Sequence, residues 1–481
     1  MIWKPAVLKT AWTDILEFIQ TCQTRNLLIM AIHVIFAFLL LKIDSLDYSG
    51  KLTMFAFLSA MTLWILTKVP AGLVAMCMLL VVILLKAGEP DILYHSLSEE
   101  VVWLMIGSFI IGEAIKQSGL ADRISQMIVQ RTQRKSSILS MLTFVLFLSS
   151  FFIPSTSGRA ALSMPVMKQL SKLFSKPENE VLAMIVPVMI LMSTSATLIG
   201  AGSHLIGIGI LKTTTGQSIS FMQWLFWSVP FTLVVTFLSL YVMKWRLWPK
   251  RSNQRTELVE IEKTEKVPMR KKEKKTAFLI LAVALGWVTE SIHGYDLAFV
   301  TVFGALLFVL PEFGVMSWKQ GIHSVSWNLI LFVAAASALG EQLVESGVVQ
   351  WIEEEMFSFL YFFTDTPEWF IVFIILFVAV TSHLYITSHT TRAVVLIPTF
   401  IVFGQTIGAD SAGIVFLSLI GMNYCVTLPV SSKALLLFYE EGNMTYDAKK
   451  LLHISIYLMP LYVLVMFLFY FTYWKWTGLS I

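Results

Sequence analysis

Long apolar runs flank one short polar stretch, Pro154-Ser155-Thr156-Ser157-Gly158-Arg159-Ala160-Ala161. A second stretch, Thr387-Ser388-His389-Thr390-Thr391-Arg392-Ala393-Val394, repeats this pattern far down the chain. A guanidinium is always charged, and a charge between apolar runs is costly unless a partner or a function requires it. The two stretches therefore decide how the fold of the whole chain is interpreted.

The composition is typical of a protein embedded in a membrane. Of 481 residues, 57% are hydrophobic and 14% are charged, and the mean hydropathy is +0.75. Several runs reach the roughly 20 apolar residues that cross a bilayer as a helix, whereas β-barrel alternation is absent. The sequence predicts an all-α polytopic membrane protein with about 11 transmembrane helices. Its net charge of +4 gives no reason to expect a nucleic-acid partner.

Apolar runs of span length divide the chain into two halves joined by a charged linker. We expect an amphipathic cytoplasmic segment at 1–26, a first half at 27–245, a cytoplasmic linker at 246–275 and a second half at 276–481. Each half holds a hairpin-like region, at 137–171 and 369–405, and an interrupted helix, at 181–212 and 411–440. The three cysteines, Cys22, Cys77 and Cys425, are far apart and indicate neither a disulfide framework nor a metal site.

Lysine and arginine bias predicts the orientation. If the N-terminus is cytoplasmic and each hairpin returns to its own side, the basic connectors and the 246–275 linker fall inside, and the acidic residues between 345 and 368 fall outside. We expect about eleven crossings of the cytoplasmic (inner) membrane, with the C-terminus outside.

The two halves are an internal repeat. Alignment of the polar stretches pairs Ser155 with Ser388, Ser157 with Thr390 and Arg159 with Arg392, without a gap. Because the preceding spans run in opposite directions, the repeats are predicted to be inverted. Inverted repeats with interrupted helices at matching positions indicate a secondary transporter with a binding site near the bilayer midplane.

The polar stretches have the chemistry of an anion site. Helix N-termini favour negative charge, serine and threonine hydroxyls add donors, and a guanidinium binds a carboxylate in a bidentate manner. Alternatively, each arginine snorkels to the surface or pairs with a structural acid, and Glu113 and Glu341 lie at matched positions as charge partners. His389 could bind substrate, carry a proton or make an ordinary polar contact, and His204 is equally ambiguous.

At these residues the sequence resembles the divalent anion:sodium symporter family. The family's Ser-Asn-Thr signatures, each followed by a proline, fall on Ser155-Thr156-Ser157 with Pro165 and on Ser388-His389-Thr390 with Pro398. Its helix breaks fall on Ala196-Thr197-Leu198-Ile199-Gly200 and on Thr427-Leu428-Pro429. The resemblance implies a homodimer in membrane lipid, re-entrant hairpins, elevator-type transport and an anionic substrate such as a dicarboxylate, citrate or sulfate. The implied substrate-binding residues are Ser155, Thr156, Ser157, Arg159, Thr197, Gly200, Ser388, His389, Thr390, Arg392, Thr427 and Pro429.

This sequence departs from the family at the positions that handle sodium. The signature asparagines are Thr156 and His389, and the family's sodium-binding hydroxyl before each signature is Phe151 or Leu384. We hypothesise that the two guanidinium groups replace two sodium ions, which makes sodium coupling doubtful and favours anion exchange or proton coupling through His389, Glu113 or Glu341.

Other classes of function remain open. The main alternative is a sodium-coupled anion symporter, followed by an anion channel and by a membrane-embedded hydrolase that uses Ser155 or Ser388. The sequence contains neither a G-x-S-x-G elbow nor an H-E-x-x-H motif. We therefore expect no catalytic residue, no enzyme activity and no cofactor.

Overall fold

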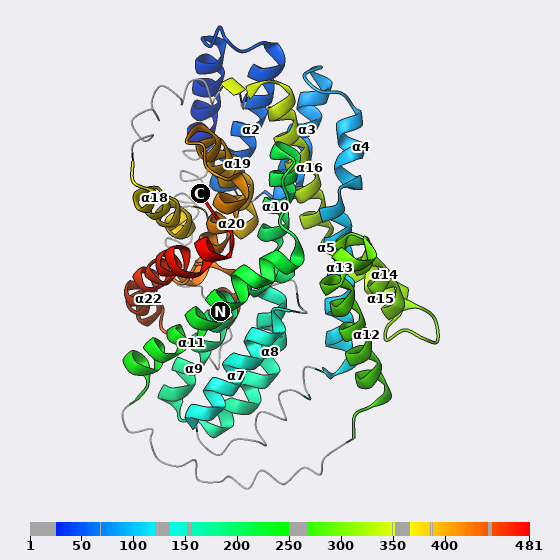
Figure 1. The fold of residues 1–481 in the computed structure, drawn as a ribbon, viewed down its shortest axis with the longest axis vertical. Helices are drawn as coiled ribbons and strands as arrows, with labels where there is room; N and C mark the ends of the chain where they lie inside the picture. The colour runs from blue at the N-terminus through cyan, green and yellow to red at the C-terminus, as the bar shows by residue number, and fades with distance from the viewer. Residues whose placement is uncertain are drawn as a thin grey trace, which may run out of the picture. The chain divides into compact units, whose positions relative to one another are not determined.

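The computed structural model describes residues 26–67, 69–120, 123, 135–151, 153, 156–249, 268–348, 350–351, 366–384, 386, 388–440 and 445–481. Throughout these ranges the regular elements are helices and there is no strand, as Figure 1 shows. The prediction of an all-helical protein is confirmed for this part of the chain.

Helices of the first half precede and follow one hairpin-like pair. They are Asn26–Leu41, α2 (Tyr48–Leu66), α3 (Ala71–Leu84), α4 (Asp91–Ser98), α5 (Glu100–Ser118), α7 (Lys135–Ser149), α8 (Thr156–Leu170), η1 (Ser171–Leu173), α9 (Lys176–Met192), η2 (Thr194–Ala196), η3 (Leu198–Gly200), α10 (Gly202–Thr215) and α11 (Phe221–Leu247). The expected interruption of the segment at 181–212 is present: α9 ends at Met192, two short 3₁₀ turns follow, and α10 starts at Gly202.

The second half repeats this order of elements. Its helices are α12 (Lys271–Val288), α13 (Glu290–His293), α14 (Leu297–Val309), α15 (Trp318–Ser324), α16 (Trp327–Glu345), α18 (Glu368–Thr381), η5 (Ser382–Leu384), α19 (His389–Thr406), α20 (Ser411–Met422), η6 (Pro429–Ser431), α21 (Lys433–Glu440), α22 (Ala448–Phe469), η7 (Tyr470–Trp474) and η8 (Lys475–Thr477). The second interruption, between α20 and α21, also lies where the sequence predicts it.

Five of the described helices are long and apolar enough to cross a bilayer: Glu100–Ser118, Lys176–Ala196, Phe221–Leu247, Trp327–Glu345 and Ala448–Thr477. Six shorter apolar helices accompany them within the described ranges. The chain is therefore a multi-pass membrane protein.

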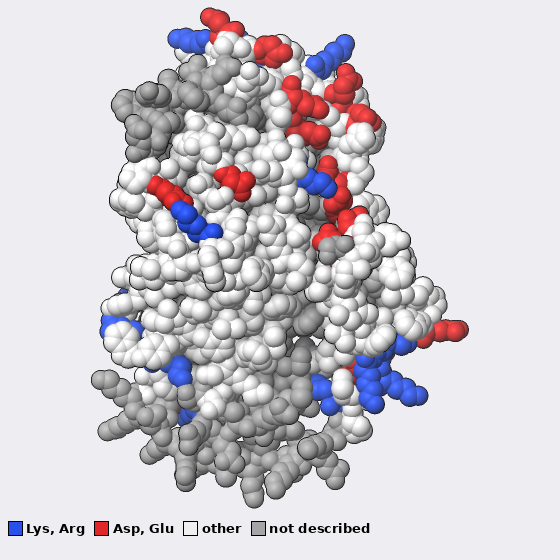
Figure 2. Space-filling model, in the orientation of Figure 1, with Lys and Arg blue, Asp and Glu red and all other residues white. Residues whose placement is uncertain are grey.

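The charged linker is shorter than predicted at both ends. Helix α11 continues to Leu247, and α12 already begins at Lys271. The α12 start is fixed by Glu273, whose carboxylate accepts from the Arg270 backbone N–H at 3.1 Å. Exposed basic side chains gather on this first turn, and Figure 2 shows them as a blue cluster. Residues 250–267 of the linker and residues 1–25 of the N-terminal segment lie outside the described residues.

Contacts divide the chain into two compact units that cut across the sequence halves. The first comprises Met1–Ser96 and Leu331–Glu355, and the second comprises Leu97–Ile330 and Met356–Ile481. In the first unit, Ser49 and Gln342 both donate to the Ala87 carbonyl, at 2.6 and 3.1 Å. Buried Leu46, Leu343 and Val348 pack together beside these bonds.

In the second unit the hairpin-like pairs pack reciprocally. Helix α8 packs against α21 of the other half, and α19 packs against α10. The broken helices pack in the same crossed manner, α9 against α21 and α20 against α10. Each hairpin arm therefore covers the second segment of the other half's broken helix. This exchange brings the two polar stretches and the two breaks into one compact unit.

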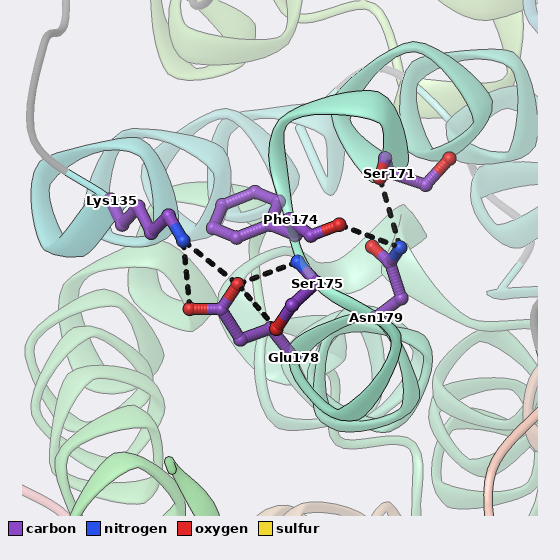
Figure 3. Close-up of polar contacts among 6 residues, drawn as sticks. All are labelled: Lys135, Ser171, Phe174, Ser175, Glu178 and Asn179. Carbon is purple, nitrogen blue, oxygen red and sulfur yellow. Dashed lines mark hydrogen bonds and ion pairs between the residues drawn. The ribbon is translucent and has the colours of Figure 1, made fainter. Parts of the chain in front are cut away.

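A buried charge cluster fastens the base of the first hairpin-like pair. The Lys135 ammonium at the start of α7 lies 2.8 and 2.9 Å from the two carboxylate oxygens of Glu178. Glu178 also accepts from the backbone N–H and hydroxyl of Ser175 at 2.7 and 2.9 Å, as Figure 3 shows. The Asn179 amide donates to the carbonyls of Ser171 and Phe174, at 2.9 and 3.2 Å. The N-terminus of α7, at Lys135, and the residues that follow α8 thus both bond to the N-terminal turn of α9.

Candidate functional site

Arg159 lies in the first turn of α8 and reaches the end of α9. Its side chain is 1% exposed. Nη1 donates to the Ser193 hydroxyl at 3.1 Å, and Nη2 donates to the Thr194 hydroxyl at 2.7 Å. Both hydroxyls donate in turn to the Ile190 carbonyl in the last turn of α9, at 3.1 and 2.8 Å. The guanidinium therefore lies at a helix C-terminus, where the helix dipole favours positive charge.

Arg392 has the equivalent position in the second half. It is fully buried in the first turn of α19. Its Nη1 donates to the Met422 carbonyl at 2.6 Å and to the Tyr424 carbonyl at 3.3 Å. Met422 is the last residue of α20, so this guanidinium also lies at the C-terminal end of a half-helix. The gapless pairing of the two arginines in the sequence thus corresponds to equivalent places in the structure.

Of the two acidic charge partners expected from the sequence, Glu113 bonds within its own helix. The carboxylate of Glu113 accepts from the Gln117 amide at 3.0 Å and lies 3.4 Å from the Lys116 ammonium. Within the described residues, Arg159 bonds to the hydroxyls at the α9 end and not to Glu113. Glu341 is half-buried on α16, in the other compact unit, and its role as a charge partner stays a prediction.

In the second polar stretch, the Ser388 side chain is exposed, Thr390 is half-buried and Thr391 is buried. Ser388 is exposed, and its hydroxyl caps α19 by accepting from the Thr391 N–H at 3.3 Å. It also lies 3.0 Å from the Thr390 hydroxyl. His389 is half-buried, with Nε2 at 3.3 Å from the Cys425 sulfur in the second break. A Cβ built on Gly202 would lie 3.7 Å from the Thr390 methyl, so this stretch also reaches the start of α10.

The first polar stretch is described only in part. Ser155 lies outside the described residues, whereas Thr156 and Ser157 are half-buried in the first turn of α8. The helix therefore starts directly at the polar stretch, as α19 does in the second half. These N-termini supply the positive dipole ends that the anion-site prediction requires.

The predicted break residues hold the unwound backbone in place. The Thr197 hydroxyl donates to the Ser150 carbonyl at 2.7 Å. A Cβ on Gly200 would lie 2.2 Å from the Thr194 carbonyl oxygen, so only glycine fits there. In the second break, the Thr427 hydroxyl lies 2.6 Å from His383 Nε2, and Pro429 begins η6.

Neighbouring helices satisfy the backbone groups that the first break leaves unpaired. Trp224 Nε1 and the Ser228 hydroxyl of α11 donate to the carbonyls of Ser195 and Ala196, at 3.1 and 3.0 Å. Unwound backbone at membrane depth needs such partners. Donors from α11 therefore stabilise the break in its extended form.

Asn423 connects the two breaks. Its Nδ2 donates to the Ser195 hydroxyl at 2.7 Å and lies 2.6 Å from His204 Nε2. His204 Nδ1 lies 3.1 and 3.2 Å from the carbonyls of Thr197 and Leu198. Both ring nitrogens of His204 thus lie within hydrogen-bond distance of a partner. These buried contacts join the first break to the end of α20 at the second break.

Comparison with known proteins identifies the family. Residues 20–480 match the model of the sodium:sulfate symporter transmembrane region. The chain belongs to this family of transporters. The resemblance to the divalent anion:sodium symporters is thereby confirmed, as is the expectation that the protein is not an enzyme.

Relatives in the family include carriers of different substrates. The chain is 21% identical to the sodium-dependent dicarboxylate transporter SdcS of Staphylococcus saprophyticus, over 93% of this chain and 91% of the relative. It is 22% identical to the citrate/succinate antiporter of Escherichia coli K12, over 69% of this chain and 70% of the relative. The crystal structure of the YdaH transporter of Alcanivorax borkumensis has a similar fold, with a TM-score of 0.53, 11% identity and coverage of 80% of this chain and 88% of that one.

Several side chains of this polar region are absent from the binding residues expected from the sequence. Ser193, Thr194, Ser195, Asn423 and Tyr424 lie in the predicted breaks but were not expected to take part in the site, and His383 and Ser455 were not singled out. The hydroxyls of Ser193, Thr194 and Ser195 and the amide of Asn423 lie where the two helices are interrupted. Polar side chains at a helix break are a signal that the sequence alone provides. His383 follows Thr381-Ser382 at the end of an apolar run, and Ser455 lies two residues after His453 in another apolar run.

Proposed function

We propose that this protein is a secondary active transporter that moves a small di- or trivalent anion across the cytoplasmic membrane. Membership of a transporter family supports the class of function. Relatives named as dicarboxylate and citrate/succinate transporters support a carboxylate substrate. Sulfate, which appears in the family's description, is the second substrate class.

The observation that carries the proposal is the equivalent placement of two buried arginines. Each guanidinium lies at the C-terminal end of a half-helix, beside hydroxyls in one half and carbonyls in the other. In secondary transporters, carbonyls and half-helix C-termini of this kind bind the coupling cation. A guanidinium that donates to them occupies their lone pairs. We therefore propose that Arg159 and Arg392 replace two bound sodium ions.

Fixed positive charges have a consequence for coupling. With a dianion bound, the two guanidinium charges are compensated. The empty carrier would have to move both charges through a poorly solvated barrier, which is costly. Exchange of one anion for another, or transport with protons, is therefore favoured over sodium symport.

The substrate groups in this proposal are the polar stretches and the breaks. Ser155, Thr156, Ser157, Ser388, His389 and Thr390 supply donors at the hairpin tips, and Thr197, Gly200, Thr427 and Pro429 shape the breaks. The arginines hold the breaks and set the positive potential that attracts the anion. The reciprocal packing of the two halves supports inverted repeats with re-entrant hairpins. Elevator-type movement and a homodimer belong to the same proposal through the family.

Counterflow in proteoliposomes tests this function. Vesicles loaded with unlabelled succinate, citrate or sulfate should accumulate the matching labelled anion saturably, and equally well in sodium and in choline buffers. Strict sodium dependence would instead establish the sodium-coupled symporter. Currents that do not saturate, without counterflow, would establish a channel.

A further inference from the structure

A buried histidine ends the first arm of the second hairpin-like pair. His383 lies in η5 and is 1% exposed. Its Nδ1 lies 2.6 Å from the Val380 carbonyl, and its Nε2 lies 2.6 Å from the Thr427 hydroxyl in the second break. A carbonyl only accepts hydrogen bonds, so Nδ1 carries a hydrogen. The neutral ring therefore accepts from Thr427 through Nε2.

The bond from His383 continues as a chain of hydroxyl groups into α22. The Thr427 oxygen lies 2.9 Å from the Ser455 hydroxyl, which lies 3.1 Å from the Tyr424 hydroxyl. Tyr424 has further acceptors within reach, the carbonyls of Val426 at 3.4 Å and Ser455 at 3.5 Å. The chain thus joins the hairpin, the break and α22.

The row of hydrogen-bonded groups from His383 to Tyr424 has two arrangements of its hydrogens in which every group keeps a partner. With neutral His383, each hydroxyl donates toward the ring: Tyr424 to Ser455, Ser455 to Thr427, and Thr427 to Nε2. When a proton binds Nε2, the ring donates to Thr427, each hydroxyl turns the other way, and Tyr424 donates to a carbonyl. No covalent bond breaks and no group loses its partner, because a hydroxyl both donates and accepts. The site can therefore take up one proton without disrupting the break.

The first half has the same connection without a titratable group. In the gapless register that pairs Arg159 with Arg392, Ser150 corresponds to His383. In the breaks, the shared Thr-Leu pair matches Thr197 with Thr427, in a register shorter by three residues. There, the Thr197 hydroxyl donates to the Ser150 backbone carbonyl. Both halves thus connect the threonine of the break to the end of the first hairpin arm. Only the second half makes this connection through a group that can bind a proton.

Charges around His383 couple its proton to the substrate. The titratable or charged groups near it are Arg392 and His389 of α19 and Tyr424 of the break. Behind them, Tyr462 of α22 packs on Tyr424, and Cys425 contacts His389. Arg392 opposes a second positive charge on His383, and a bound anion offsets that repulsion. By linkage, a proton on His383 must then strengthen anion binding by the same factor. Leu428, beside Thr427, is exposed, so this side of the break lies at the protein surface.

From this geometry we propose that His383 binds a proton together with the anionic substrate and is the proton-coupling residue of the transporter. The inference rests on the proposed transport function and assigns its coupling ion. It places the proton at the junction of hairpin and break in the second half, and not at His389 in the polar stretch.

The test is the pH dependence of the KM for succinate counterflow, measured at pH 7.5 and at pH 5.5 with the same pH on both sides. The KM of the wild type should be about fivefold lower at pH 5.5 than at pH 7.5, because about fivefold is the smallest usual coupling factor between two binding sites. His383→Gln should lose this decrease, because glutamine can bond to Thr427 but does not titrate.

A matched pair of variants separates proton binding from structural support. Thr427→Val and Thr197→Val remove equivalent hydroxyls from the two breaks, and both should slow transport. Only Thr427→Val should flatten the pH response, since only its hydroxyl contacts a titratable group. Equal pH responses in wild type, His383→Gln and Thr427→Val would overturn the inference. Absence of counterflow in the wild type at either pH would instead overturn the proposed transport function.

Discussion

Arg159 and Arg392 show how a single residue type can change the chemistry of a site. Both are buried, and both donate to the C-terminal end of the half-helix that follows in the chain. A guanidinium suits both positions because its charge complements the helix dipole. At Arg159 its planar fork also reaches two acceptors through two nitrogens. Lysine would keep the charge, but its ammonium group is a compact point charge without the planar fork of a guanidinium.

Removal of one of these charges should therefore impair transport strongly. We expect Arg159→Gln to lower succinate counterflow by about 10²-fold, because loss of one partner of a buried charge interaction costs about 2–5 kcal/mol. Arg159→Lys should be less impaired, by about tenfold, since it keeps the charge but loses the fork.

The matched control is Arg246→Gln, which changes an exposed arginine of α11. Its counterflow should stay within about twofold of the wild type, as for other exposed charges. Size-exclusion profiles would establish that each variant is folded. Full transport by the double variant Arg159→Thr and Arg392→Thr would contradict the role assigned to both arginines.

The arginines also illustrate what the sequence could and could not predict. Their repeat register, their position at hairpin tips and the two helix breaks followed from polar residues inside apolar runs. The bonds that Arg392 makes to main-chain carbonyls did not, because a helix C-terminal carbonyl carries no side-chain signal. For Arg159, the sequence offered Glu113 as a charge partner and not the hydroxyls at the end of α9. His383 was missed because it precedes the polar stretch at 387–394 that the repeat singles out, and its partner in the other half is Ser150.

At the scale of elements, the first hairpin-like pair is held at its base by the buried contact between Lys135 and Glu178. The Glu178 side chain is 2% exposed and the Lys135 side chain 19%. The carboxylate also caps α9 through Ser175. One acidic group thus fixes a hairpin arm and the start of the adjoining broken helix.

Glu178→Gln should lower the free energy of unfolding by about 2–3 kcal/mol, because a neutral amide leaves the Lys135 charge without its partner in a poorly solvated place. The readout is the midpoint of thermal unfolding in detergent, followed by tryptophan fluorescence. Glu180→Gln, on the same helix, breaks the more exposed pair with Lys450 and should cost at most about 1 kcal/mol. Identical midpoints for the two variants would show that the buried pair does not fasten the hairpin.

For the whole molecule, the decisive feature is reciprocal packing of the two halves, since each hairpin arm lies on the other half's broken helix. The positions of the helices and breaks followed from hydropathy and repeat register. The two compact units could not be predicted in this way. Residues 331–355 belong to the first unit although more than two hundred residues separate them from the rest of it. A local sequence pattern carries no information on such distant contacts.

The predicted orientation is testable in cells. Green fluorescent protein fused within 246–275, after truncation there, should fluoresce because this segment is expected in the cytoplasm, where basic loops remain. The same protein fused after Ile481 should be dark, and alkaline phosphatase fused there should be active. A fluorescent C-terminal fusion would require an even number of crossings in place of about eleven.

The two arginines also differ in how readily mutation can undo them. Arg159 depends on the hydroxyls of Ser193 and Thr194, which one substitution each can delete. Arg392 depends on the main-chain carbonyls of Met422 and Tyr424, which every amino acid supplies. The second half therefore keeps a cation-binding backbone whatever side chains occupy these positions. An attempt to engineer metal-ion dependence into this carrier should begin there, with a short residue in place of Arg392.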